Sequence, residues 1–371
     1  MAEKKKVLFL LEGFDKGGIE KVTLDIVNNL DPEKYDITVQ TFWFGGHCQS
    51  LAAPHVKVIP FFFRRYVRGI IRLIQYLSPR MLYRLFVRGR YDVEIACSDG
   101  GAAKVISGST NPNSRKICWV HMDVVERGSK LKEFRNADTA SPIYSRFDRI
   151  ACVSQKALNR FREKFGDYPD MVAVHNPLLD EQIRDRSREF SVERRKPVEF
   201  VTVGRIAEEK GFDRLAAAAA KLKNENFNFL VRIVGDGGKR QELEQYIQSE
   251  HLEDVVFLEG FRSNPYPYIA AADWYVCSSL DEGCPLTIGE AFCLGKPVLG
   301  TDCSGVREWL GDSCYGIVME NSTDGIYMGL KRVLLMDDAE KVCWKHVAEE
   351  HCHKLSFDKE FSAWQKDMLG D

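Results

Sequence analysis

Two basic side chains five positions apart, Arg205 and Lys210, are the clearest candidates for chemistry in this sequence. They follow an apolar run that predicts a buried strand, and glycines stand beside them at Gly204 and Gly211. Guanidinium and ammonium groups at the end of a strand can converge on one diphosphate. Most Arg/Lys pairs are solvated surface charges, but a position at the end of a strand favours a phosphate site here.

A second segment, Ser278–Phe292, carries two glutamates eight positions apart, Glu282 and Glu290. The backbone N–H groups between them stand at a predicted helix start, where they could bind a sugar hydroxyl and a phosphate. Apolar neighbours predict that Glu290 is partly buried and paired with a polar group. Two alternatives stay open. Glu282 could be a helix cap and Glu290 a surface residue, or the two could form a hydrolase pair, whose separation the sequence does not give.

The first half of the chain offers a glycine-containing turn and a histidine. Glu12–Glu20 joins a predicted strand to a predicted helix through Gly17 and Gly18, which allow a ligand to approach the backbone closely. A plain strand-to-helix turn is the alternative. His121 ends another predicted strand, and we expect it to contact substrate, although a structural histidine is the commoner case.

Metal binding is poorly supported by the sequence. Asp236, in the turn Val234–Gly238, is a lone carboxylate, whereas Mg²⁺ sites use one or two carboxylates together with phosphates. A group of cysteines and histidines near the end fits no regular zinc spacing. We therefore predict no metal. The group consists of Cys343, His346, His351, Cys352 and His353.

The segment Phe61–Tyr91 is rich in arginine and contains no acidic residue. Its arginines repeat at every fourth position in two runs, and apolar residues complete two amphipathic helical patterns. Such a pattern is typical of helices that lie on an anionic membrane surface or bind a phosphorylated lipid. Ordinary helices with solvated arginines are the alternative, and no recognised module accompanies the charge to support nucleic-acid binding. The runs are Arg64, Arg68 and Arg72, then Arg80, Arg84 and Arg88.

Short, continuous apolar runs alternate with helical patterns in both halves, which predicts two α/β domains with parallel sheets covered on both faces. We expect an N-terminal domain over residues 1–179, a polar linker over 180–197, and a C-terminal domain over 198–354, with a ligand cleft between the domains. Residues 355–371 predict an amphipathic helix that could return to the first domain. The predicted strands are Lys6–Leu11, Tyr35–Thr41, Val56–Pro60, Val93–Cys97, Arg115–His121, Arg149–Ser154, Met171–His175, Val198–Val203, Phe229–Val234, Val255–Leu258, Trp274–Cys277, Pro297–Thr301 and Gly316–Val318.

Length and composition fit this organisation. A chain of 371 residues exceeds the usual size of a single core, and a net charge of -2 does not indicate a polyanion-binding protein. The eleven scattered cysteines indicate reduced thiols rather than a disulfide framework. No apolar segment is long enough to span a bilayer, so we expect a cytoplasmic protein.

In order and spacing, the motifs of the second half resemble glycosyltransferase family 4, the retaining enzymes of the GT-B fold. The resemblance is specific over Val203–Glu308 and thinner in the first half, and it implies two doubly wound, Rossmann-like α/β domains facing across a cleft, with the C-terminal helix returning to the N-terminal domain. The matching motifs are Gly204-Arg205, Lys210-Gly211, Gly235–Gly237, Phe257–Phe261, Asn264–Tyr268, Ala272-Asp273, Ser278-Ser279, Glu282 with Glu290, Gly295–Val298 and Thr301–Gly305, and in the first half Gly17–Glu20, His121, Ser154 and Asn176-Pro177.

The resemblance also implies a role for each site residue. Arg205 and Lys210 would neutralise the donor diphosphate, and Glu290 would bind the ribose hydroxyls. Glu282 would hold the transferred sugar, with His121 touching its ring. The remaining donor-binding residues would be Gly18, Gly204, Gly235, Phe261, Arg262, Gly283, Cys284, Pro285, Leu286 and Thr287, and Gly17 would lie on the acceptor side. Cys284 stands where many relatives have an aromatic residue, so we expect a sugar pocket of different shape.

The segment Asn264–Tyr268 looks like that of enzymes that build bacterial capsule, O-antigen and exopolysaccharide repeats. This resemblance implies transfer, with retention, of a hexose or N-acetylhexosamine from a UDP-sugar to a polyprenyl-diphosphate-linked glycan on the inner face of the cytoplasmic membrane. Fixed Arg and Lys charges would replace a divalent cation, so no cofactor is expected. The alternatives are a soluble transferase acting on a small molecule or a protein, a sugar-phosphate epimerase, and a non-catalytic scaffold on the membrane surface.

Overall fold

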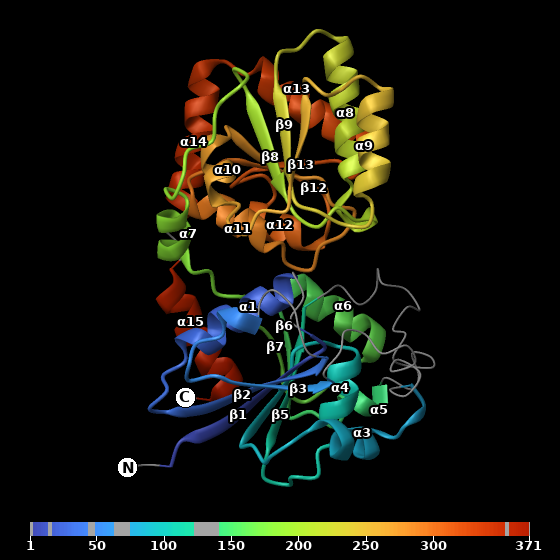
Figure 1. The fold of residues 1–371 in the computed structure, drawn as a ribbon, viewed down its shortest axis with the longest axis vertical. Coiled ribbons are helices and arrows are strands. Elements are labelled where there is room, and N and C mark those ends of the chain that lie inside the picture. The colour runs from blue at the N-terminus through green and yellow to red at the C-terminus, as the bar shows by residue number, and fades with distance from the viewer. Residues whose placement is uncertain are drawn as a thin grey trace. The chain divides into compact units, whose positions relative to one another are not determined.

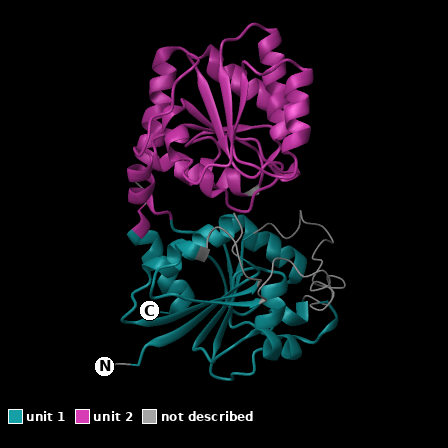
Figure 2. Cartoon of the chain, viewed as in Figure 1, with its two compact units in different colours: residues 1–177, 358–371 teal, residues 178–357 magenta. Residues whose placement is uncertain are grey.

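The computed structural model describes residues 3–13, 17–43, 49–62, 75–121, 141–352 and 356–370. The chain forms two compact units (Figure 2): unit 1 comprises residues 1–177 and 358–371, and unit 2 comprises residues 178–357. Each unit is a parallel sheet with helices on both faces (Figure 1), as the continuous apolar strands predict.

Unit 1 contains a seven-stranded sheet in the order β3-β2-β1-β4-β5-β6-β7, with every described pair parallel. The strand order reverses between β1 and β4, which is the point at which open α/β sheets bind ligands. The strands are β1 Lys5–Leu11, β2 Tyr35–Trp43, β3 Lys57–Phe62, β4 Val93–Ala96, β5 Arg115–Val120, β6 Arg149–Cys152 and β7 Met171–Ala173. The helices are α1 Gly18–Asn29, η1 Gln49–Leu51, α3 Pro79–Phe86, α4 Gly101–Ile106, α5 Ser141–Tyr144, α6 Gln155–Phe165 and α15 Phe357–Leu369.

Helix α15 completes the core of unit 1 although it comes last in the chain. Its Trp364 is fully buried, with ring centroids 6.2 Å from Phe9 on β1 and 5.6 Å from Trp119 on β5. Arg149, at the start of β6, donates a hydrogen bond to the backbone oxygen of Asp367. The C-terminal helix is therefore a structural part of unit 1.

Unit 2 contains a six-stranded parallel sheet in the order β10-β9-β8-β11-β12-β13. Its strands are β8 Glu199–Val203, β9 Leu230–Val234, β10 Val256–Gly260, β11 Trp274–Cys277, β12 Val298–Thr301 and β13 Ile317–Met319. The helices are α7 Asp180–Arg186, η3 Glu208–Lys210, α8 Phe212–Asn224, α9 Arg240–Ser249, α10 Tyr266–Ala271, α11 Leu286–Cys293, α12 Ser304–Leu310, α13 Thr323–Leu335 and α14 Asp338–Cys352. The ends of all predicted strands in both units lie within two residues of those observed.

The stretch expected as a linker, residues 180–197, is part of unit 2. It begins with α7, whose Ile183 is 2 % exposed and lies in an apolar cluster with residues of α10 and α11. Asp180 and Arg184 pair on this helix at 2.8 Å. Helix α7 is polar in composition because only a narrow face of it is buried, and Ile183 supplies that face.

Candidate donor site

Lys210 and Glu282 lie in direct contact at the carboxyl edge of the sheet of unit 2. Lys210 ends η3 after β8, Glu282 follows β11, and the Lys210 ammonium pairs with Oε1 of Glu282. Their side chains are 23 % and 15 % exposed, respectively. Burial disfavours the ammonium charge, but the adjacent Glu282 carboxylate outweighs it and raises the pKa of Lys210. The sequence placed these two residues in separate motifs, and the fold joins them in one ion pair.

The backbone around Lys210 is held against the loop that carries Glu282. Gly211 has a φ of 60°, and a Cβ atom there would lie only 2.4 Å from the backbone oxygen of Ser278. The Ser278 hydroxyl donates to the backbone oxygen of Lys210 at 2.9 Å. Only glycine combines the left-handed conformation with this close approach, so Gly211 allows the two loops to meet.

Arg205 does not take part in the ion pair between Lys210 and Glu282. Its side chain is 68 % exposed, and Nη2 donates to Oε1 of Glu209 at 2.7 Å. The pair is an exposed contact within one turn, a type that contributes little to stability. Arg205 can therefore reorient toward a ligand at small cost, and its role at the diphosphate stays a prediction.

Three glycines, Gly204, Gly235 and Gly260, stand at the carboxyl ends of the adjacent strands β8, β9 and β10, and they bring the predicted base-binding residues to the same edge of the sheet. A Cβ atom on Gly235 would lie 1.8 Å from the backbone oxygen of Gly204, so no side chain fits between these turns. The Gly235 N–H donates to the Gly260 oxygen at 2.9 Å. The next residues, Phe261 and Arg262, are exposed, with Phe261 at 40 %. An exposed aromatic ring beside bare backbone suits a planar base.

The segment from Glu282 to Glu290 leads into α11, which starts at Leu286 after Pro285. Glu290 is 4 % exposed, so it is not a surface residue. The Glu282 backbone oxygen accepts a hydrogen bond from the Gly305 N–H at 2.7 Å, which holds this loop to α12. Burial raises the pKa of the Cys284 thiol to about 12, so this residue is a neutral thiol. Gly283 and Thr287 lie in the same segment.

Ser279 has a role in the site that its place in the motif Ser278-Ser279 did not predict. Ser279 is 2 % exposed, and its hydroxyl donates to Oε1 of Glu282 at 2.7 Å. Its backbone oxygen accepts from the Thr301 hydroxyl at 2.5 Å. The available signal was two consecutive serines directly after a buried strand, because polar side chains buried at such a place need partners.

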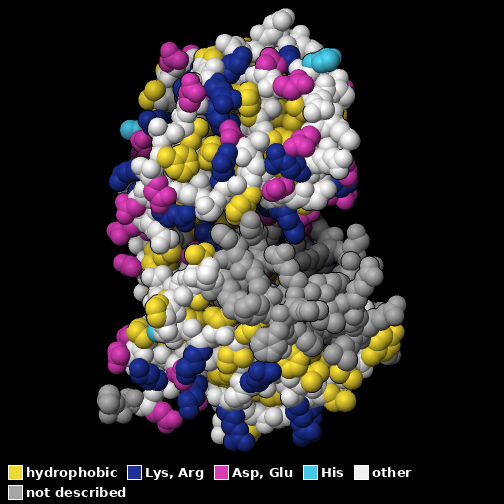
Figure 3. Space-filling model, in the orientation of Figure 1, with side chains coloured by type: hydrophobic (Ala, Val, Ile, Leu, Met, Phe, Trp, Pro, Cys, Tyr) yellow, Lys and Arg dark blue, Asp and Glu magenta, His cyan; other side chains and the backbone are white. Residues whose placement is uncertain are grey.

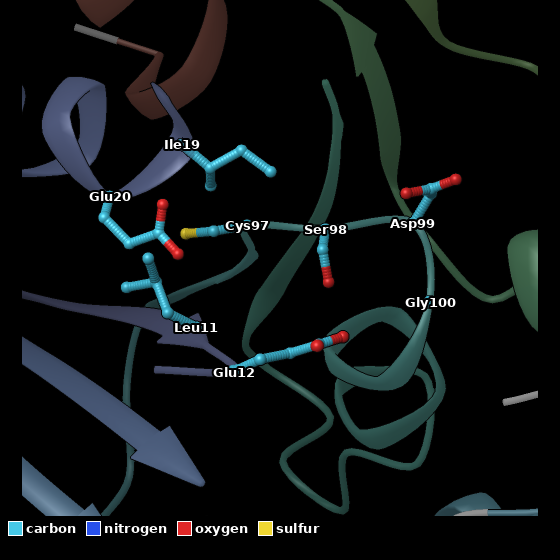
Figure 4. Close-up of a pocket in the computed structure, with 8 residues that line it drawn as sticks. All are labelled: Leu11, Glu12, Ile19, Glu20, Cys97, Ser98, Asp99 and Gly100. Carbon is cyan, nitrogen blue, oxygen red and sulfur yellow. The ribbon is translucent and has the colours of Figure 1, made fainter. Parts of the chain in front are cut away.

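In unit 1 a cavity of about 140 Å³ lies at the carboxyl ends of β1 and β4. Figure 4 shows the side chains of Glu12, Glu20 and Ser98 extending toward a common space, whereas Asp99 turns away from it. The Glu20 carboxylate lies over the start of α1, because a Cβ atom on Gly17 would be 2.2 Å from its Oε2. The acidic lining favours hydroxyl groups over phosphate beside this helix start. A phosphate contact at Gly18 stays a prediction.

His121 lies directly after β5 and is 9 % exposed. Its ring centroid lies 4.2 Å from that of Trp119, and no described residue forms a hydrogen bond with its Nε2. Burial lowers the pKa of His121 to about 3, so the imidazole is neutral at physiological pH. A neutral ring with an unpaired nitrogen can donate or accept one hydrogen bond but carries no charge.

Helix α3 carries Arg80 and Arg84 of the second predicted arginine run, whereas Arg88 lies two residues beyond the end of the helix at Phe86. Arg80, Arg84 and Arg88 are exposed, and none of them forms an ion pair with a described residue. Met81 and Leu85 on the same helix are 56 % and 42 % exposed. In Figure 3 hydrophobic side chains gather over the part of unit 1 where Figure 1 draws α3, with basic ones along the edge. The first run, Arg64, Arg68 and Arg72, lies outside the described residues.

Within the described ranges, no helix is long and apolar enough to cross a membrane. The same ranges contain no group of three His, Cys, Asp or Glu side chains placed to hold a metal ion.

Two family models match the chain, one on each unit. The model described as Glycosyltransferase Family 4 matches residues 16–181, and the one described as Glycosyl transferases group 1 matches residues 183–345. A solved structure of an Anabaena protein in complex with UDP-glucose has the same fold, with a TM-score of 0.78 and 19 % identity over 99 % of this chain and all of the other. The two parallel-sheet units, together with the two matching family models, place the chain in the GT-B class of glycosyltransferases. Within that class, the chain belongs to glycosyltransferase family 4.

Two curated relatives match part of the chain. An uncharacterized glycosyltransferase of Methanocaldococcus jannaschii is 31 % identical over 48 % of this chain and 41 % of its own length. A Campylobacter jejuni protein is 29 % identical over 59 % of each chain. It is named N-acetylgalactosamine-N,N'-diacetylbacillosaminyl-diphospho-undecaprenol 4-alpha-N-acetylgalactosaminyltransferase. The chain thus spans about half the length of these two relatives.

Proposed function

We propose that this protein is a hexosyltransferase that uses a nucleotide sugar, with the donor bound by unit 2. The observation that carries the proposal is the partly buried contact between Lys210 and Glu282 at the carboxyl edge of the sheet. One partner supplies positive charge for a diphosphate, and the other supplies a carboxylate for sugar hydroxyls. Because the two groups touch, they suit a ligand in which diphosphate and sugar are adjacent.

In the proposed reaction the bond between the sugar and the diphosphate breaks, and charge develops on the leaving phosphate. Lys210 stabilises that charge, and Arg205 adds to it once it leaves Glu209. Glu282 binds the sugar, and the acceptor hydroxyl attacks with retention while the leaving phosphate takes up its proton. Since fixed cations act on the diphosphate, we propose that the reaction needs no divalent metal.

The proposed donor is a UDP-sugar carrying a hexose or N-acetylhexosamine. The UDP-glucose bound by the Anabaena protein of the same fold supports this choice of nucleotide. Gly235, Phe261 and Arg262 would receive the base, and Glu290 the ribose. A screen of UDP-, GDP- and ADP-sugars in EDTA tests the proposal. We expect UDP-sugars alone to raise the thermal unfolding temperature and to be hydrolysed slowly. Absence of any nucleotide-sugar binding or hydrolysis contradicts it.

The proposed acceptor is a polyprenyl-diphosphate-linked glycan of a surface polysaccharide, bound by unit 1. The Campylobacter jejuni relative, whose name includes a diphospho-undecaprenol, supports this class. The cavity beside Glu12 and Ser98 offers acceptors for hydroxyl groups of a neutral sugar. A soluble transferase with a small or protein acceptor is the competing function, and transfer to a water-soluble oligosaccharide at the same rate as to the lipid-linked glycan would favour it.

The exposed face of α3 supports a location on the inner, anionic surface of the cytoplasmic membrane. Guanidinium groups without acidic partners attract anionic headgroups, each contributing about 1 kcal/mol near the surface, and Met81 and Leu85 can enter the interface. We expect the triple change of Arg80, Arg84 and Arg88 to Gln to abolish sedimentation with phosphatidylglycerol vesicles. The matched control changes Arg188, Arg332 and Lys345 to Gln, removing three exposed charges from unit 2. Equal binding by both triple variants contradicts the proposed surface.

A further inference from the structure

Ser279 connects Glu282 to the sheet of unit 2. The Ser279 hydroxyl donates to Oε1 of Glu282 at 2.7 Å, on the same oxygen that Lys210 contacts. The Ser279 backbone oxygen accepts from the hydroxyl of Thr301, the last residue of β12, at 2.5 Å. Ser279 and Thr301 are 2 % and 0 % exposed. The carboxylate is thus tied, through one serine, to the end of a buried strand.

The direction of the Ser279 proton follows from its second contact. The Cys277 thiol lies 3.6 Å from the Ser279 oxygen and donates to it. Burial, aided by the Glu282 charge, raises the pKa of Cys277 to about 11, so the thiol keeps its proton at neutral pH. Since the thiol supplies a donor, the serine hydroxyl is left to donate to Glu282.

Both contacts of Glu282 fall on Oε1, and no described residue forms a hydrogen bond with Oε2. With one oxygen fixed by Ser279 and Lys210, the plane of the carboxylate is fixed, and Oε2 can accept from a sugar hydroxyl. We propose that Ser279 is a positioning residue for the transferred sugar, which acts by orienting Glu282. This inference rests on the proposed donor site in unit 2.

The neighbouring Ser278 provides a matched comparison. Its hydroxyl donates to the Lys210 backbone oxygen at 2.9 Å, and its backbone oxygen accepts from Arg214 at 2.7 Å. Ser278 therefore supports the part of the site assigned to the diphosphate, whereas Ser279 supports the part assigned to the sugar. The two serines are 1 % and 2 % exposed, so Ser→Ala is a comparable change at each.

The experiment measures UDP affinity by calorimetry, and kcat and KM with UDP-glucose and UDP-N-acetylglucosamine. For Ser279→Ala we expect UDP affinity within about twofold of wild type and a kcat about 10- to 100-fold lower, the range for losing a hydrogen bond to a charged group that sets alignment. Ser279→Thr keeps the hydroxyl and should recover most of the kcat. For Ser278→Ala we expect UDP and UDP-sugar binding to weaken together. Ser279→Cys, which keeps the size but has a weak donor, replaces Ser279→Ala if that variant does not fold.

The possible failures are distinguishable. If wild type turns over a UDP-sugar and Ser279→Ala does so equally well, the positioning role is wrong and the proposed function stands. Equal losses in UDP affinity and in kcat for Ser279→Ala, with no recovery in Ser279→Thr, mean that the serine only supports the loop, and this also overturns the inference. If wild type neither binds UDP nor turns over a UDP-sugar, the proposed function falls, and the role of Ser279 falls with it.

Discussion

Replacing Lys210 by alanine is the most direct perturbation of the donor site. The change removes the ammonium group that contacts Glu282 and leaves that carboxylate, 15 % exposed, with Ser279 as its described partner. A hydrogen bond between charged groups contributes about 1.5–3 kcal/mol, which corresponds to about 10- to 150-fold in affinity. Without the lysine, the negative charge of the carboxylate also repels the diphosphate, so we expect UDP affinity and kcat/KM to fall by at least this range.

The same substitution should lower the free energy of unfolding by about 1–2 kcal/mol, less than for a fully buried pair because both side chains retain some exposure. Calorimetry with UDP and denaturant unfolding measure the two effects separately. Lys221→Ala, which removes an exposed ion pair with Asp324, is the control and should change neither by more than about 0.5 kcal/mol. Wild-type UDP affinity and turnover in Lys210→Ala would refute the assignment of the diphosphate to this lysine.

Three further predictions concern other described contacts. Gly211→Ala should lower the free energy of unfolding by about 1–3 kcal/mol, because φ is 60° and the new Cβ meets the Ser278 oxygen; Gly238→Ala, with open space around it, is the control in thermal unfolding. The pKa of His121 is lowered in the folded protein, so below pH 6.5 the unfolded chain binds a proton at this residue that the folded chain does not. The free energy of unfolding therefore decreases as the pH falls from 6.5 to about 3. His121→Gln should remove a slope of about 1.4 kcal/mol per pH unit from denaturant unfolding over that window, and parallel pH profiles would contradict this. Glu12→Gln should raise the KM for a polyprenyl-diphosphate-linked glycan about 5- to 30-fold and leave UDP affinity unchanged. A change in UDP affinity without a change in this KM would contradict the assignment of Glu12 to the acceptor site.

The strands were predictable because their apolar runs are continuous. Each predicted strand is found, and even β9, which contains Arg232, reads as a strand because its neighbours are apolar. The partners of that arginine were not predictable. Arg232 is 2 % exposed and bonds Glu199 on β8 at 3.1 Å and Glu259 on β10 at 2.6 Å. Pairing across three strands depends on sheet order, which the sequence pattern leaves open.

In the candidate site, too, the positions of residues along the chain were predictable and their partners were not. The positions of Lys210 and Glu282 at strand ends followed from local sequence. Their contact depends on β8 and β11 being neighbours in the sheet, although the 70 residues from 204 to 273 lie between these two strands in the chain. Arg205 was expected beside Lys210, yet among the described residues it pairs with Glu209, within the same turn. Side-chain direction at an exposed position is set by small energies that residue spacing does not encode.

The return of α15 to unit 1 has a consequence for synthesis of the chain. Unit 2 is continuous from residue 178 to 357, so it can fold once those residues have left the ribosome. Unit 1 cannot bury Phe9 and Trp119 fully until Trp364 has emerged, nearly the whole chain later. The domain translated first is thus completed last, and a premature stop shortly before Trp364 would damage the N-terminal half while sparing the fold of the donor-binding unit.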